Sequence, residues 1–269
     1  MTDACAPPIG DRKLRLLCLH GYMQDAAIFR SRLGSMRKGL KSRAEFFFLD
    51  APFPATPAAA ADQQANDAVE GSQGRSWWQW TDLDPGTRPS RAAHYSGWEV
   101  SQAAITAALQ EHAPIDAILG FSQGATAAAL YLAHTEPQPA EQEEGLNGST
   151  QQQQQHTWQQ RQDQLRAAII IAGFLPRDES YAATVRSRGP SLPCLHVSGA
   201  KDTLVPPDRT SELRQCFSQH STRVYTHPGA HMVPTCSGDF KEVLLGMLTS
   251  VKQGRQHEWA ALAGTDGKQ

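Results

Sequence analysis

The sequence predicts an α/β fold in which a mainly parallel central sheet is covered by helices on both faces. Short apolar segments of strand length alternate along the chain with longer segments whose apolar residues recur at helical spacing. Polar and glycine-containing motifs directly follow several predicted strands, as in parallel sheets whose loops carry a site. A chain of 269 residues is long enough for one large domain of this kind.

The first half of the chain contains two predicted buried strands, at residues 13–19 and 45–50. Between them, apolar residues at near-helical spacing predict a single helix over residues 26–40. We interpret residues 55–75, rich in Ala, Gln, Asp and Gly, as a long loop or partly helical cap near the substrate mouth. A further helix is expected over residues 96–110.

The second half continues the alternation of strands and helices and closes on an amphipathic helix. Strands are expected at residues 117–119, 166–171, 191–199 and 223–227, with the last one at a sheet edge. Helices are expected from the end of the first of these strands to about residue 135, then over residues 207–218 and 240–252.

We expect one domain over residues 1–269, with its core at about 13–252 and disordered tails at 1–12 and 253–269. Residues 136–165 contain five consecutive glutamines and have almost nothing to bury. We interpret this low-complexity segment as a tolerated surface insertion, because long surface loops cost little free energy. An interaction role for the segment is the alternative.

The composition describes a globular chain and excludes several classes of function. A formal net charge of −2 gives no electrostatic basis for binding nucleic acid or an anionic membrane. The five cysteines are scattered and contain no Cys-x-x-Cys pair, which argues against a disulfide framework and a zinc site. No apolar stretch approaches the ~20 residues of a membrane span, and the N-terminus does not resemble a signal peptide. We therefore expect a cytoplasmic protein.

The motif Gly-x-Ser-x-Gly at residues 120–124 lies between a short apolar run and an Ala-rich helical segment. This order of strand, tight turn and helix is the context of a nucleophile elbow. Glycines suit Gly120 and Gly124 because a serine held on a strained turn crowds its neighbours. We predict that Ser122 is the nucleophile, and that the backbone N–H of Gln123 stabilises the oxyanion.

The first predicted strand runs directly into His20-Gly21, which without the elbow would be read as an ordinary strand-to-loop turn. In hydrolases with an elbow, the loop at this position supplies a second N–H to the oxyanion hole. We predict Tyr22 for this donor, with Met23 as the alternative.

The chain order Ser, acid, His of elbow hydrolases narrows the choice of base. His231 lies in a Gly-containing turn just past the last predicted strand, where its imidazole can reach the elbow. His227, still on that strand, is the alternative.

For the acid we predict Asp202, which lies at the end of a buried strand. A carboxylate there would hold the Nδ1–H of His231. Asp208 is expected to cap the next helix. Asp178, which follows the preceding strand, is the other alternative for the acid.

Apolar side chains near the opening of the predicted active site favour an acyl chain over a sugar or a peptide as the bound group. The tryptophans in residues 77–80 would either line an acyl pocket or pack a loop onto the sheet. The candidate pocket residues are Met23, Phe53, Trp77, Trp78, Phe174 and Met232.

Taken together, these motifs resemble the FSH-type serine hydrolases, the family of the ovarian cancer-associated protein 2 homologues, over roughly residues 13–252. The resemblance rests on residues 19–24, 76–78, 120–124, 198–202 and 228–231, in this order. It implies an α/β-hydrolase fold, a triad of Ser122, Asp202 and His231, and no metal or organic cofactor. The chain departs from the family mainly in the Gln-rich segment.

The sequence therefore predicts a serine carboxylesterase that hydrolyses small-molecule esters with alkyl acyl chains through an acyl-enzyme. An acyl-thioesterase of the same fold is one alternative, because its elbow and triad would look the same. A catalytically silent hydrolase fold used as a binding module is the other.

Overall fold

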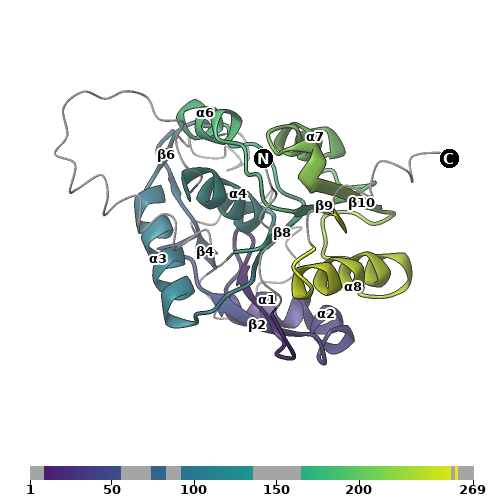
Figure 1. Cartoon of the computed structure of the whole chain (residues 1–269). Helices are drawn as coiled ribbons and strands as arrows, with labels where there is room; N and C mark the ends of the chain where they lie inside the picture. Colours follow the sequence, from purple (N-terminus) through teal and green to yellow (C-terminus); the bar gives the residue numbers. More distant parts are fainter. Residues whose placement is uncertain (1–8, 56–73, 83–91, 136–164, 256–257, 260–269) are drawn as a thin grey trace, which may run out of the picture.

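The computed structural model describes residues 9–55, 74–82, 92–135, 165–255 and 258–259 (Figure 1). Nearly all of the Gln-rich segment, most of the expected loop or cap at 55–75 and most of both expected tails lie outside these ranges. The described residues form a six-stranded sheet in the order β10-β9-β8-β7-β1-β2. Every neighbouring pair in this sheet is parallel, so the predicted α/β class is confirmed.

The central strands lie within a few residues of their predicted positions, because buried parallel strands give continuous apolar runs. β10 is an edge strand, as expected. The six strands are β1 (Leu14–Leu19), β2 (Ala44–Leu49), β7 (Ala117–Phe121), β8 (Ala167–Ile171), β9 (Cys194–Gly199) and β10 (Thr222–His227).

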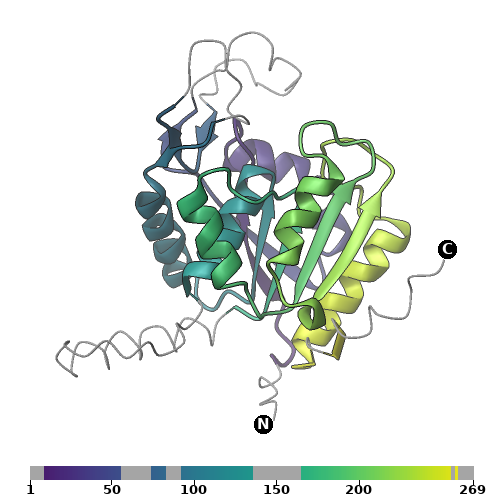
Figure 2. The same ribbon diagram turned by 90° about the horizontal axis from the view of Figure 1, so that it is seen from above.

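Helices cover both faces of the sheet and bury two separate apolar clusters against it (Figures 1 and 2). On one face lie α1 (Ala26–Arg32), α2 (Gly34–Gly39) and α8 (Gly238–Lys252). On the other face lie α3 (Trp98–Glu111), α4 (Gln123–Thr135), α6 (Glu179–Ser187) and α7 (Pro207–Gln215).

The structure corrects three details of the sequence prediction. The single helix expected over residues 26–40 is two helices, which divide at Leu33 just before Gly34, the second-weakest helix former after proline. Helix α6 was not predicted, because only Ala182 and Val185 of its short sequence are buried.

The third correction concerns two small antiparallel ribbons that the sequence prediction missed. They pair β3 (Phe53–Pro54) with β4 (Arg75–Ser76), and β5 (Gln79–Trp80) with β6 (Tyr95–Ser96). Strands of two residues are too short to produce a visible alternation.

His196, in the middle of β9, is a buried polar group that predicts a pH dependence of stability. It is 1% exposed and its ring meets Phe217 edge-on at 4.7 Å. Neither ring nitrogen has a hydrogen-bond partner among the described residues. Burial lowers the pKa of His196 from 6.5 to about 3, so the folded protein holds this imidazole neutral.

Below pH 6.5 the unfolded chain binds more protons at His196 than the folded protein does, so stability falls as the pH falls toward 3. We expect His196→Leu to lessen the loss of unfolding free energy between pH 7 and pH 5 by roughly 2 kcal/mol. Urea unfolding at both pH values measures this loss. His220→Leu, at an exposed histidine, should behave as wild type; an equal pH dependence in all three proteins would contradict the prediction.

Candidate active site

Ser122 occupies a sharp turn between β7 and α4, with a left-handed φ of 53°. Its backbone N–H donates to the Ile171 carbonyl of the neighbouring strand at 2.8 Å. A Cβ atom at Gly124 would lie 2.3 Å from two carbonyl oxygens at the end of β1, and one at Gly120 would lie 2.4 Å from the Gly124 carbonyl. The backbones therefore approach too closely for any side chain at these two positions, as the elbow motif predicts.

A row of hydrogen bonds joins the three residues that the sequence singled out. His231 Nε2 lies 2.9 Å from Ser122 Oγ, and His231 Nδ1 lies 2.7 Å from Asp202 Oδ2. The other Asp202 oxygen accepts the backbone N–H groups of Leu204 at 2.9 Å and Val205 at 2.8 Å. A carboxylate anchored in this way favours the tautomer with a proton on Nδ1, which leaves the Nε2 lone pair facing the serine hydroxyl.

The alternatives for the base and the acid have other roles in the structure. The Nδ1 atom of buried His227 accepts the Gly229 N–H at 3.1 Å. Asp178 is the N-cap of α6 and also accepts the Tyr95 N–H at 2.8 Å. Asp208 lies in the first turn of α7, whose N-cap is the preceding Pro206, so the expectation that Asp208 caps this helix is wrong.

The loop after β1 is anchored by the ring of His20, which is 0% exposed. The Nε2 atom accepts the Ala51 N–H at 3.0 Å, so the proton is on Nδ1, which donates to the Gly21 carbonyl at 2.8 Å. Burial lowers the pKa of His20, which keeps the ring neutral. The sequence pointed to this loop but not to the role of the histidine ring.

Of the two candidate oxyanion donors in the loop after β1, Met23 already has another hydrogen-bond acceptor. Its N–H donates to the Arg75 carbonyl at 3.1 Å, and its φ is 62°. Tyr22 remains the predicted donor of the loop. Gln123 is the first residue of α4, so its N–H has no acceptor within the helix.

Trp77 and Trp78 are buried parts of the scaffold, with 0% and 1% exposure. They offer a substrate almost no surface in this conformation, so the expectation that they line a pocket is corrected in favour of packing. Trp77 connects the loop after β1 to the start of the elbow helix. Its indole N–H donates to the His20 carbonyl at 2.8 Å, and its backbone N–H donates to Gln123 Oε1 at 3.1 Å. Apart from the tryptophan cluster itself, no sequence pattern indicated this bridge.

The other candidate pocket residues keep some exposed surface. Met23, Phe53 and Phe174 are partly buried, and Met232 is 44% exposed. Both backbone polar groups of Phe174 bond to the hydroxyl of Thr126 on the elbow helix, at 2.8 and 3.1 Å. Phe174 therefore lies beside the first turns of α4.

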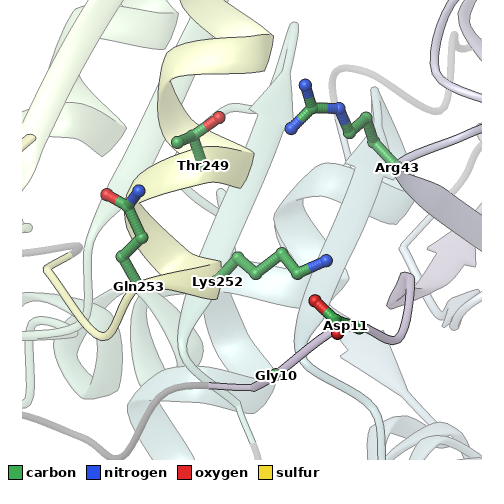
Figure 3. A pocket seen from close by; sticks show the side chains of 6 residues that line it. All are labelled: Gly10, Asp11, Arg43, Thr249, Lys252 and Gln253. Atoms are coloured by element: carbon green, nitrogen blue, oxygen red, sulfur yellow. The ribbon is translucent and has the colours of Figure 1, made fainter.

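An open pocket lies at the edge of the sheet where the strands begin, opposite the edge that carries Ser122, and some of its residues directly precede β1 and β2 (Figure 3). Figure 3 shows the Lys252 side chain extended toward Asp11 across this pocket. None of the three residues joined at the elbow contributes to it. Its lining residues are Gly10, Asp11, Arg43, Thr249, Lys252 and Gln253.

In the described parts of the chain, no group of three or more His, Cys, Asp or Glu side chains is placed to hold a metal ion. No helix among the same residues is both long and apolar enough to cross a membrane.

The crystal structure of esterase PE8 is similar to this fold, with a TM-score of 0.55 and 19% identity over 91% of this chain and 96% of that one. The parallel sheet, the elbow after β7 and the side chains gathered at the strand ends are those of a serine hydrolase with the α/β-hydrolase fold.

A family model described as "Serine hydrolase (FSH1)" matches residues 10–243, and the chain belongs to this family. Among its relatives is human "Esterase OVCA2", 31% identical over 84% of this chain and 92% of the relative. Another is "Esterase C25G4.2" of Caenorhabditis elegans, 30% identical over 88% of this chain and 93% of the relative. The family resemblance of the sequence motifs is confirmed.

The bridge through Trp77 can be tested with a matched pair of variants. Trp77→Phe removes the indole N–H that holds the His20 carbonyl, so the loop after β1 should be less fixed. We expect about a tenfold slower reaction of Ser122 with a fluorophosphonate probe. Trp78→Phe removes a similar volume, but the Trp78 indole nitrogen has no hydrogen-bond partner among the described residues. Its reaction rate should stay near that of wild type, and equal losses in both variants would contradict the bridging role.

Proposed function

We propose that this protein is a carboxylesterase that hydrolyses small-molecule esters with alkyl acyl chains through an acyl-enzyme on Ser122. The observation that carries the proposal is the row of hydrogen bonds from Ser122 through His231 to Asp202. The names of the relatives, several of which are called esterases, support the same class of reaction.

In the proposed reaction, Ser122 Oγ attacks the ester carbonyl carbon while His231 Nε2 takes the hydroxyl proton. Asp202 stabilises the imidazolium that forms. The tetrahedral intermediate then collapses, and His231 gives its proton to the leaving alcohol. A water molecule, deprotonated by His231, attacks the acyl-enzyme in the same way and releases the carboxylic acid, which restores Ser122.

The negative oxygen of each tetrahedral intermediate needs donors that are already in place. We propose the backbone N–H groups of Tyr22 and Gln123. Support comes from the anchoring of both segments, one by the buried ring of His20 and the other by the bonds of the Gln123 side chain. A donor held this rigidly needs no reorganisation when charge develops.

Exposed apolar side chains around the triad support an acyl chain as the bound group. Leu204, just past Asp202, is 47% exposed, and Met232, next to His231, is 44% exposed. Large exposed apolar side chains close in sequence to two residues of the proposed triad favour an alkyl substrate over a polar one.

The same residues would act on a thioester, so the nature of the leaving group is decided by measurement. We favour the oxoester because the relatives are named esterases. A silent binding module is disfavoured, because the base lies 2.9 Å from the serine and is itself held by a carboxylate.

Hydrolysis of p-nitrophenyl esters over a range of acyl lengths, for wild type and Ser122→Ala, tests the proposal. We expect wild-type turnover and a loss of at least about a thousandfold in the variant, because the variant has no nucleophile. A matched series of thioesters distinguishes the two leaving groups. Equal inactivity of both proteins on every oxoester and thioester would overturn the enzymatic proposal and favour the binding module.

A further inference from the structure

Arg209, in the first turn of α7, is a partly buried cation beside the proposed active site. Its guanidinium carbon lies 4.6 Å from the centre of the Phe174 ring. Phe174 is in turn fixed to the elbow helix through Thr126, whose backbone N–H donates to the Ser122 carbonyl at 3.1 Å. A continuous chain of contacts therefore joins the guanidinium to the residue that carries the nucleophile.

The face of α7 that carries Arg209 also carries Leu213, which packs against the end of β8 and the elbow helix. Leu213, one turn further along the helix, is 0% exposed. A Cβ atom at Gly173 would lie 3.0 Å from the Leu213 side chain and 3.1 Å from that of Ala125, so both helices meet at the end of β8. Figure 2 shows α7 and α4 on the same face of the sheet. Arg209 shares the inward face with Leu213 because residues four apart lie on the same side of a helix.

The start of α7 is also tied to the acid of the triad. Val205, just before the helix, donates its N–H to Asp202 Oδ1. The segment that leads into α7 is thus anchored to Asp202, while the Arg209 guanidinium lies over Phe174, which is bonded to the elbow helix.

Arg209 forms no direct ion pair with a carboxylate in the described part of the chain, although Glu212 on the same helix acts on its pKa. None of the ion pairs found there includes it. Burial lowers the pKa of Arg209, and the neighbouring Arg177 guanidinium lowers it further, against opposing effects of Tyr95 and Glu212. A cation that is partly removed from water and lies near a second cation gains free energy when an anion binds.

We propose that Arg209 recognises a carboxylate on the substrate, so that the enzyme accepts esters whose acyl chain ends in an anionic carboxylate. This inference rests on the proposed esterase function and names its substrate class. Phe174 would contact the alkyl part of the chain, and the guanidinium above its ring would pair with the terminal carboxylate. Arginine suits this role because its planar fork can form two parallel hydrogen bonds to a carboxylate.

The test compares esters that differ only in the terminal group. Mono-p-nitrophenyl adipate and p-nitrophenyl hexanoate form one pair, and the suberate half-ester and the octanoate form a longer pair. The quantity measured is the ratio of kcat/KM for the half-ester to kcat/KM for the neutral ester. We expect Arg209→Met to lower this ratio by about tenfold or more in at least one pair, and Arg209→Lys to restore part of it.

Arg214→Met is the matched control, because it removes the same charge from the far end of the same helix. Its ratio should equal that of wild type. In wild type the ratio should also fall with rising ionic strength, which tests the charge pairing without any variant.

A ratio that Arg209→Met leaves unchanged would overturn the inference. So would a ratio that Arg209→Met and Arg214→Met lower equally. The inference would also be overturned if wild type hydrolysed the neutral esters and its rate on the half-esters did not change with ionic strength. Those results leave the esterase proposal standing, whereas the absence of turnover on any ester would remove both.

Discussion

The site depends on a close backbone contact between the start of α4 and the end of β1. At Gly124 a Cβ atom would meet two carbonyl oxygens at 2.3 Å, so the helix can take this position only because a glycine stands there. The chain reaches this helix through Ser122 in a left-handed conformation with φ of 53°. Backbone strain of this kind persists only where the surroundings hold it, and here two buried strands and a buried helix do so.

The parallel sheet brings the other residues of the site to this turn. The loops that follow β7, β9 and β10 emerge at the same edge, which brings Ser122, Asp202 and His231 within hydrogen-bond distance although they are far apart in the sequence. A second layer of buried polar groups, formed by His20, Trp77 and the Gln123 side chain, fixes the two backbone segments beside the serine. The His20 ring, the Trp77 indole and the Gln123 side-chain amide each have hydrogen-bond partners, as burial requires.

The sequence predicted the central strands and the elbow well, because long apolar runs and a Gly-x-Ser-x-Gly motif depend only on local chemistry. It placed His231 by chain order and by its position after a strand, and the structure brings that residue to Ser122. It missed α6 and the small ribbons, which have too few buried residues to leave a pattern. The sequence left open whether Trp77 and Trp78 line a pocket or pack a loop onto the sheet, because burial of an aromatic cluster depends on contacts between distant segments.

The most direct test of the central claim is to identify the residue that carries the acyl group during turnover. The protein would be mixed with a slowly deacylated p-nitrophenyl ester, quenched in acid, digested and analysed by mass spectrometry. The account predicts that the peptide containing Ser122 gains the mass of the acyl group, and that it gains none in Ser122→Ala. Acylation of a different residue, or continued hydrolysis by Ser122→Ala, would contradict it.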